Sequence, residues 1–163
     1  MPVDSALFRR TMGQFATGIT VVTTHDESGR RLGLTVNAFA SVSLDPPLVL
    51  VSIDNRSEAR AGFDSSGRFG VSVLAEGQED WSRRFAAGGE GKWTGGGLVT
   101  GATGVALVPG ALAYVECSVF ARHPAGDHTI YVGLVERLEV NPGRPLLYHG
   151  SAYGRMEGPT RGE

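Results

Sequence analysis

The stretch Gly33–Pro47 constrains this chain most, because two kinds of side chain alternate along it before a proline-rich turn. Within it, Leu34–Ser41 alternates aliphatic even-numbered residues with odd-numbered residues that are mostly polar. Successive side chains of a strand point to opposite faces, so we predict one strand with an aliphatic core face and a polar second face. The Asp45-Pro46-Pro47 turn should end the pairing, because proline has no N–H to donate.

The polar face of this predicted strand has two explanations. A buried polar group needs a hydrogen-bonding partner, and a flat ligand with donors and acceptors would supply several. Alternatively, the face is simply solvated, which is the usual arrangement in antiparallel sheets. The residues alone leave both explanations open.

Short strands dominate the rest of the chain. Runs of β-branched and aliphatic residues are separated by turns rich in Gly, Pro and Asp, a pattern typical of antiparallel β-proteins. About seven strands with a few short helices favour an antiparallel barrel, since closure hides the sheet edges. The other predicted strands are Ile19–Thr24, Leu48–Ile53 (buried on both faces), Arg68–Leu74, Leu112–Ala121, His128–Val140 and a closing segment, Leu146–Tyr153.

Two of these strands should form a hairpin, because the turn-forming residues His123–Asp127 lie between them. In the first strand, Val115 and Cys117 belong to an alternating apolar face. In the second, Ile130 and Val132 begin another apolar face that continues through Leu134, Leu138 and Val140.

Three short helices are predicted. The first is capped by Asp4 or Ser5, and the others are Ser57–Phe63 and Gln78–Ala86. The start of Ser57–Phe63 is suited to an anion, because a helix start offers unpaired N–H groups and a partial positive charge. The plainer explanation is that Ser57 is an ordinary cap. The apolar face and the C-cap of the first helix are Phe8, Met12, Phe15 and Gly18.

The glycine-dense segment Gly88–Gly97 resembles a phosphate loop only superficially. In the motif G-x-x-x-x-G-K-[ST], Gly91 and Lys92 would match the second glycine and the lysine. The first glycine is then replaced by Ala86, and Trp93 stands where Ser or Thr should follow. We therefore interpret this segment as a mobile lid or a connection.

Composition and charge narrow the function further. A formal charge of −2 argues against a protein that neutralises nucleic-acid phosphates, and the longest apolar runs are too short to cross a membrane. The single cysteine excludes an internal disulfide and favours a cytoplasmic location. The four histidines lack metal-ligand spacing, so no metal site is predicted. One domain over residues 1–163 is expected, with an ordered core at about 5–154 and a flexible tail at 155–163.

Four segments, in order along the chain, carry a resemblance to a known family. They are FATGITVVTT (Phe15–Thr24), GLTVNAFASVSLDPPLVLVSID (Gly33–Asp54), RFGVSVLA (Arg68–Ala75) and GDHTIYVGLVE (Gly126–Glu136). Together they resemble the flavin reductase family with the FMN-binding split-barrel fold, of antiparallel Greek-key type. The resemblance implies an NAD(P)H:flavin oxidoreductase that uses FMN or FAD with NADH or NADPH. It also implies a homodimer that supplies reduced flavin to a separate flavin-dependent monooxygenase.

The same resemblance assigns roles to individual residues. Residues along the isoalloxazine ring would be Thr35, Val36, Asn37, Ala38, Ser41 and Val42. The loop and helix start that hold the flavin phosphate would be Ser52, Ile53, Asp54, Asn55, Arg56, Ser57 and Ala59. The nicotinamide side would be Gly126, Asp127 and His128, with His128 facing the hydride donor. Phe85 and Lys92 would lie near the ring edge or adenylate path, and Tyr153 would be a C-terminal position on the ligand side.

Two other functions remain open on the residues. One is a split-barrel protein that holds flavin tightly and carries electrons, or has lost turnover. The other is an oxidase of the pyridoxamine-phosphate type, although such phosphate sites use more Arg and Lys than this chain provides. For each candidate residue an ordinary role, such as a core aromatic, a solvated arginine or an idle turn histidine, is the competing interpretation.

Overall fold

The computed structural model describes residues 3–158, and strands account for most of its regular structure. The helices are α1 (Ser5–Met12), α2 (Ala59–Ser65), α3 (Glu79–Ala86) and the 3₁₀ helix η1 (Glu90–Trp93). The first six strands are β1 (Thr17–Gly18), β2 (Thr20–His25), β3 (Arg31–Val36), β4 (Phe39–Leu44), β5 (Pro47–Asp54) and β6 (Arg68–Val73). The other six are β7 (Val99–Thr100), β8 (Ala106–Leu107), β9 (Ala113–Ala125), β10 (His128–Val140), β11 (Leu147–His149) and β12 (Ala152–Gly154).

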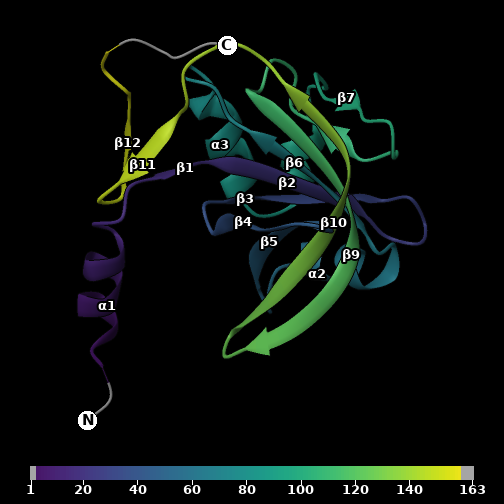
Figure 1. Cartoon of the computed structure of the whole chain (residues 1–163), viewed down its shortest axis with the longest axis horizontal. Coiled ribbons are helices and arrows are strands. Elements are labelled where there is room, and N and C mark those ends of the chain that lie inside the picture. The colour runs from purple at the N-terminus through teal and green to yellow at the C-terminus, as the bar shows by residue number, and fades with distance from the viewer. Residues whose placement is uncertain (1–2, 159–163) are drawn as a thin grey trace.

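Seven antiparallel strands form the main sheet in the order β3-β2-β6-β9-β10-β5-β4. Strands β3 and β4 lie at its opposite edges, yet β3 ends at Val36 and β4 begins at Phe39. The short link between them can span only roughly 11 Å, so the two edges must lie close together. The sheet is therefore curled into a barrel with an open seam, and the prediction of a mainly β split barrel is confirmed (Figure 1).

The barrel interior is filled by aliphatic side chains around an aromatic group. Phe63 of α2 packs against Phe69 and Tyr131, with ring centroids 5.1 and 4.7 Å apart. All three rings are fully buried, and the Tyr131 hydroxyl lies 2.9 Å from Asp64 Oδ1, to which it donates. Helix α2 therefore plugs one side of the barrel and fixes the position of the residues that precede it.

The prediction of a single strand across Gly33–Ser41 is wrong. The chain leaves β3 after Val36, crosses the seam at Asn37-Ala38 and enters β4 on the other sheet edge. Val36 is buried as predicted, but Ala38 and Ala40 are exposed. The carbonyl of Ala38 instead accepts a 3.1 Å hydrogen bond from the backbone of β5. Sequence alternation carries no information about such a crossing.

The strand β10 has the predicted bounds, but its better-buried face is the opposite one. Thr129 and Tyr131 are buried, whereas Ile130 and Val132 are only half-buried. The large Tyr131 ring belongs to the aromatic group in the core, and Gly133 leaves room there for Phe69. Leu138 and Val140 at the end of the strand are largely exposed.

Several predicted boundaries also shift. Helix α1 is capped by Asp4 as predicted but ends at Met12, so Phe15 lies beyond it and Gly18 belongs to β1. Strand β9 runs to Ala125. The hairpin turn therefore contains only Gly126 and Asp127. Strand β5 is fully buried on one face and half-buried on the other, rather than buried on both. Strands β2 and β6 and helix α3 lie within one residue of their predicted bounds. The predicted closing segment Leu146–Tyr153 forms two strands, β11 and β12, and β1, β7 and β8 were not predicted.

Helix α1 projects away from the barrel, while a three-stranded sheet β1-β11-β12 closes the nearby end (Figure 1). Within the described residues, no side chain of α1 is buried. Part of the predicted tail, residues 159–163, lies outside the described residues. The helices described in residues 3–158 include none that is long and apolar enough to span a membrane.

Candidate functional site

A cavity of about 400 Å³ opens between β3, the start of α2, the end of α3 and η1. Its volume lies in the range of about 300–1,000 Å³ that is usual for small-molecule sites. Six predicted site residues line it: Thr35, Arg56, Ser57, Ala59, Phe85 and Lys92. The structure thus brings together residues from four separate segments of the chain.

The β3 side of the cavity is held by contacts with α3 and η1. A side chain at Gly33 would meet the Phe85 ring at 3.0 Å, so glycine allows this aromatic ring to approach the strand. The Thr35 hydroxyl donates to the carbonyl oxygen of Ser82 in α3, at 2.5 Å. The Lys92 ammonium donates to the carbonyl oxygen of Gly33, at 3.0 Å. The Thr35 hydroxyl therefore has a protein partner, which neither sequence explanation had included, and its contact with flavin stays a prediction.

The α2 side presents polar groups that their chain neighbours hold. The Ser57 hydroxyl accepts from the backbone N–H of Ala59 at 3.3 Å, but the N-cap residue of α2 is Glu58, so the predicted cap at Ser57 lies one residue too early. Arg56 forms a bidentate pair with Asp54, with Nε–Oδ1 and Nη2–Oδ2 distances of 3.1 and 2.7 Å. This pairing lowers the pKa of Asp54 and raises that of Arg56. Both groups stay charged at neutral pH.

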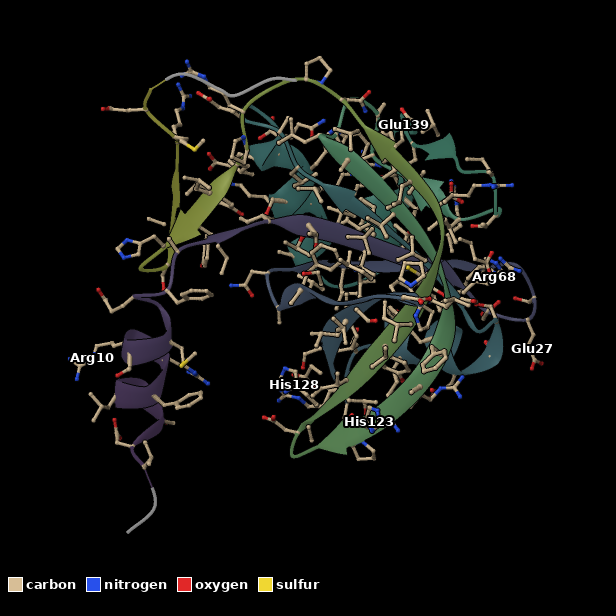
Figure 2. All side chains as sticks on the ribbon, viewed as in Figure 1. Arg10, Glu27, Arg68, His123, His128 and Glu139 are labelled. Atoms are coloured by element: carbon tan, nitrogen blue, oxygen red, sulfur yellow. The ribbon has the colours of Figure 1, made fainter. Side chains whose placement is uncertain are left out.

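The turn of the β9–β10 hairpin lies against the same side. The backbone N–H of Asn55 donates to the Asp127 carbonyl at 2.9 Å, and its side-chain oxygen accepts from Thr129 at 2.7 Å. His128 pairs in register with Asp54, and its Nδ1 lies 2.7 Å from Asp127 Oδ1. That contact lowers the pKa of Asp127. Figure 2 shows His128 near the free end of the hairpin, and His128 is not among the residues that line the cavity.

The segment Gly88–Gly97 forms the remaining wall. The Trp93 ring meets Phe85 edge-on, with centroids 5.2 Å apart, and Lys92 is partly buried. Burial lowers the pKa of Lys92, because it disfavours the charged ammonium. The segment is thus a structured part of the cavity, in addition to being the predicted connection.

Several predicted site residues lie outside this cavity. Asn37 and Ala38 line a second, more apolar cavity of about 610 Å³ at the seam. Val36 and Ile53 are buried in the core, so they can offer a ligand only backbone groups. Ser41 and Val42 lie on the exposed edge strand β4, and Ser52 is half-buried on β5. The Tyr153 hydroxyl bonds Ser82 at 2.9 Å and packs with the second core cluster.

Sequence reasoning missed an ion cluster at the cavity rim. Arg30 Nη2 lies 3.4 Å from Glu58 Oε2 and 3.1 Å from Glu90 Oε1. These residues come from the β2–β3 turn, the start of α2 and η1. The three residues share no local sequence motif. Only knowledge of which charged residues meet across the fold could have revealed the cluster.

The donor set fits a ligand that combines flat aromatic rings with a phosphate. Trp93 offers apolar ring surface, backed by the buried Phe85 ring, while Lys92, Arg56 and Ser57 offer cations and a hydroxyl. Within residues 3–158, no group of three or more His, Cys, Asp or Glu side chains is placed to hold a metal ion. Cys117 is buried away from the cavity, and burial raises its pKa to about 12.

Comparisons with known proteins agree with this kind of site. The family model described as flavin reductase like domain matches residues 12–157. The chain is 43% identical over 152 residues to an NADH-dependent flavin reductase of a Rhodococcus species, covering 91% of this chain and 85% of the relative. It is 40% identical over 159 residues to the reductase subunit HsaB of a flavin-dependent monooxygenase from Mycobacterium tuberculosis, covering 95% and 84%.

A solved structure adds a fold comparison. The NADH:FAD oxidoreductase SgcE6 of Streptomyces globisporus, in complex with NAD and FAD fragments, is 36% identical with a TM-score of 0.89. The match covers 94% of this chain and 93% of that chain. The similarity therefore extends over nearly the whole chain.

Proposed function

Because this chain belongs to the flavin reductase like domain family, we propose that it is an NAD(P)H:flavin oxidoreductase acting on FMN or FAD. The observation that carries the proposal is the cavity in which two aromatic rings, a lysine and a helix start meet. NADH is the expected donor, because the Rhodococcus and Streptomyces relatives are named for it. The flavin, when bound, supplies the hydride acceptor.

The residues at the start of α2 would hold the phosphate. Ser57 and Ala59 line the cavity at the start of α2, and Arg56 and Lys92 add positive charge to its lining. Backbone groups of Thr35–Ala38 would meet the polar edge of the ring system. Fixed N–H donors stabilise negative charge there more than water does, because they need no reorganisation.

His128 is proposed to orient the nicotinamide carboxamide at the rim, and not to act as an essential base. Its contact with Asp127 fixes the imidazole, and Asn55 holds the hairpin turn beside the α2 side of the cavity. Transfer of a hydride between stacked rings depends on distance and alignment more than on proton abstraction. His128→Ala should therefore raise the KM for nicotinamide more than it lowers kcat.

The direct test is steady-state oxidation of NADH and NADPH with FMN and with FAD, followed by the loss of nicotinamide absorbance. Flavin-dependent turnover is expected, with NADH preferred. Purified protein that oxidises neither nicotinamide with either flavin would refute the proposal. A protein that keeps its flavin through gel filtration but turns over little would favour the electron-carrier alternative.

We also propose that the chain forms a homodimer. Phe8 and Phe15 are 57% and 75% exposed, and α1, described in full, buries nothing against its own barrel. Half-buried apolar residues such as Ile130 and Val132 cover the outward face of β10. A second copy could cover both surfaces. Light scattering should give twice the chain mass, and a monomer at micromolar concentration would refute this proposal.

The reduced flavin is proposed to leave and reach a separate monooxygenase in the cytoplasm. The name of the mycobacterial relative, a monooxygenase reductase subunit, supports such a partner. Most cationic groups near the phosphate position are exposed and already paired with carboxylates, which favours modest flavin affinity. Reduced flavin trapped by an unrelated flavin-dependent oxygenase in the same solution would test its release.

A further inference from the structure

The Gly88–Gly97 wall is a segment that should move unless something outside it holds it in place. Gly89, Gly95 and Gly96 all have positive φ values, of 81°, 85° and 65°. Glycine loses the most conformational freedom on ordering, and η1, whose four residues are all described, contributes no buried side chain. Within η1 only partial burial, chiefly of Trp93 against the second core cluster, contributes to the order of the segment.

Arg84 supplies the contacts that the segment lacks. Its Nε donates to the carbonyl oxygen of Lys92 at 2.6 Å, and its Nη2 donates to that of Thr94 at 2.8 Å. Both terminal nitrogens also lie 3.3 Å from the carbonyl oxygen of Gly96. Three alternate carbonyl groups thus converge on one guanidinium, and charge-assisted hydrogen bonds of this kind are stronger than neutral ones.

The guanidinium is itself held on a rigid support. Arg84 lies in the last turn of α3, a helix that is anchored to the core by the buried residues Ser82 and Phe85. Its guanidinium carbon lies 4.6 Å from the centroid of the Trp81 ring, which stabilises the cation. Arg84 does not line the cavity. It can therefore affect a ligand only through the segment that it holds.

We infer that Arg84 is the positioning residue of this wall: it fixes Lys92 and Trp93 against β3 so that the flavin cavity exists before flavin arrives. The inference rests on the proposed function in naming flavin as the ligand. Lys92 reaches the Gly33 carbonyl, and Trp93 reaches the Phe85 ring, only while the segment keeps this path. Holding the wall in advance removes an ordering cost from flavin binding.

Arginine is required here because of its shape. The guanidinium is a planar fork with five N–H donors, so it can meet three carbonyl groups that lie around its edge. A lysine ammonium carries its donors at a single point and cannot reach all three. Arg84→Lys should therefore resemble Arg84→Ala in its effects, although it keeps the charge.

The test compares Arg84→Lys and Arg84→Ala with the matched control Arg83→Ala. Arg83 lies in the same helical turn but pairs with Glu79 at 2.5 Å on the exposed side. Hydrogen exchange is measured over residues 88–97 without flavin, and Kd for FMN and FAD is measured by fluorescence. Both Arg84 variants should exchange at least about tenfold faster in this segment and bind flavin at least about tenfold more weakly. The control should match the wild type, and kcat at saturating flavin should change little.

The outcomes separate this inference from the proposed function. Unchanged exchange over residues 88–97 in the folded Arg84→Lys protein would overturn the inference, and so would faster exchange without weaker flavin binding. If the wild type binds no flavin, the proposed function fails. In that case, faster exchange over residues 88–97 in the Arg84 variants than in the wild type would still establish Arg84 as the residue that holds the wall. If Arg84→Ala does not fold, Arg84→Lys carries the test.

Discussion

The α2 side of the cavity is held by residues that are neighbours in the chain, whereas the α3 side is assembled from distant segments. Arg56 and Asp54 are two positions apart, and so are Ser57 and Ala59. On the other side, the contact from Lys92 to Gly33 joins residues 59 positions apart. The two pairs on the first side need only local backbone geometry, whereas the Lys92 contact exists only in the finished fold.

This difference has a functional meaning. Locally paired groups such as Arg56 are exposed, so a change there should be screened by water and have modest effects. Groups on the α3 side are partly buried and support one another, so a change there should affect stability and binding together. The predictions below test this contrast from the largest expected effect to the smallest.

Replacing Phe85 should produce the largest effect. Its ring is 1% exposed, and it contacts both Trp81 and Trp93. Phe85→Ala should lower the free energy of unfolding by about 3–5 kcal/mol, because it removes a buried ring and leaves a cavity. Urea denaturation followed by tryptophan fluorescence measures this. A loss below about 1 kcal/mol would mean that the α3 side is packed loosely, contrary to our contrast.

Replacing Lys92 should weaken binding more than stability. Lys92→Met removes the ammonium that donates to Gly33 and keeps a chain of similar length. Flavin Kd should rise about tenfold, because a partly buried cation contributes more to anion binding than an exposed one. Equilibrium titration with FMN checks the value. A Kd equal to that of the wild type would remove Lys92 from the site.

Replacing Arg56 should have a smaller effect. Its side chain is 86% exposed and already paired with Asp54. Arg56→Ala should raise flavin Kd by no more than about threefold. The same FMN titration, run beside Lys92→Met, gives the comparison directly. An effect larger than that of Lys92→Met would reverse the ranking of the two sides.

The smallest expected effect is a difference between Lys92 and Arg56 in how their contributions to flavin binding depend on alkaline pH. Burial lowers the pKa of Lys92 from its ordinary value of 10.5, whereas Asp54 raises that of Arg56. As pH rises toward 10.5, Lys92 loses its proton first and Arg56 stays charged. The difference in flavin Kd between the wild type and Lys92→Met should therefore shrink with rising pH, while the difference for Arg56→Ala should persist. A Lys92→Met difference that stays constant to pH 10.5 would contradict this.

The sequence predicted the local part of the site well. The hairpin follows from the turn-forming residues His123–Asp127, and the structure contains it, with the turn itself at Gly126-Asp127. Arg56 and Ser57 lie, as predicted, in the loop just before α2. Their roles toward flavin stay predictions. The bounds of β10 were also correct. Each of these features depends on residues within a few positions of one another.

The errors share the opposite property. The alternation in β10 could not reveal which face meets Phe63 and Phe69, since those rings come from other parts of the chain. The sequence alternatives for the polar face of β3, a ligand or solvent, did not include the partner that Thr35 has, the Ser82 carbonyl 47 positions away. The anchoring role of Arg84 was invisible for a related reason, because its partners are backbone carbonyl groups and carry no side-chain signature.

The sequence by itself determined the antiparallel strands, their turns and the family, because periodicity and turn chemistry are local properties of the chain. Only the tertiary structure decided that β3 and β4 meet across a seam and that α3 and its glycine-rich segment complete the cavity. The physical reason is that each wall needs contacts between groups that the chain separates widely. Closing the barrel brings those groups within hydrogen-bonding distance, and no short stretch of sequence records that closure.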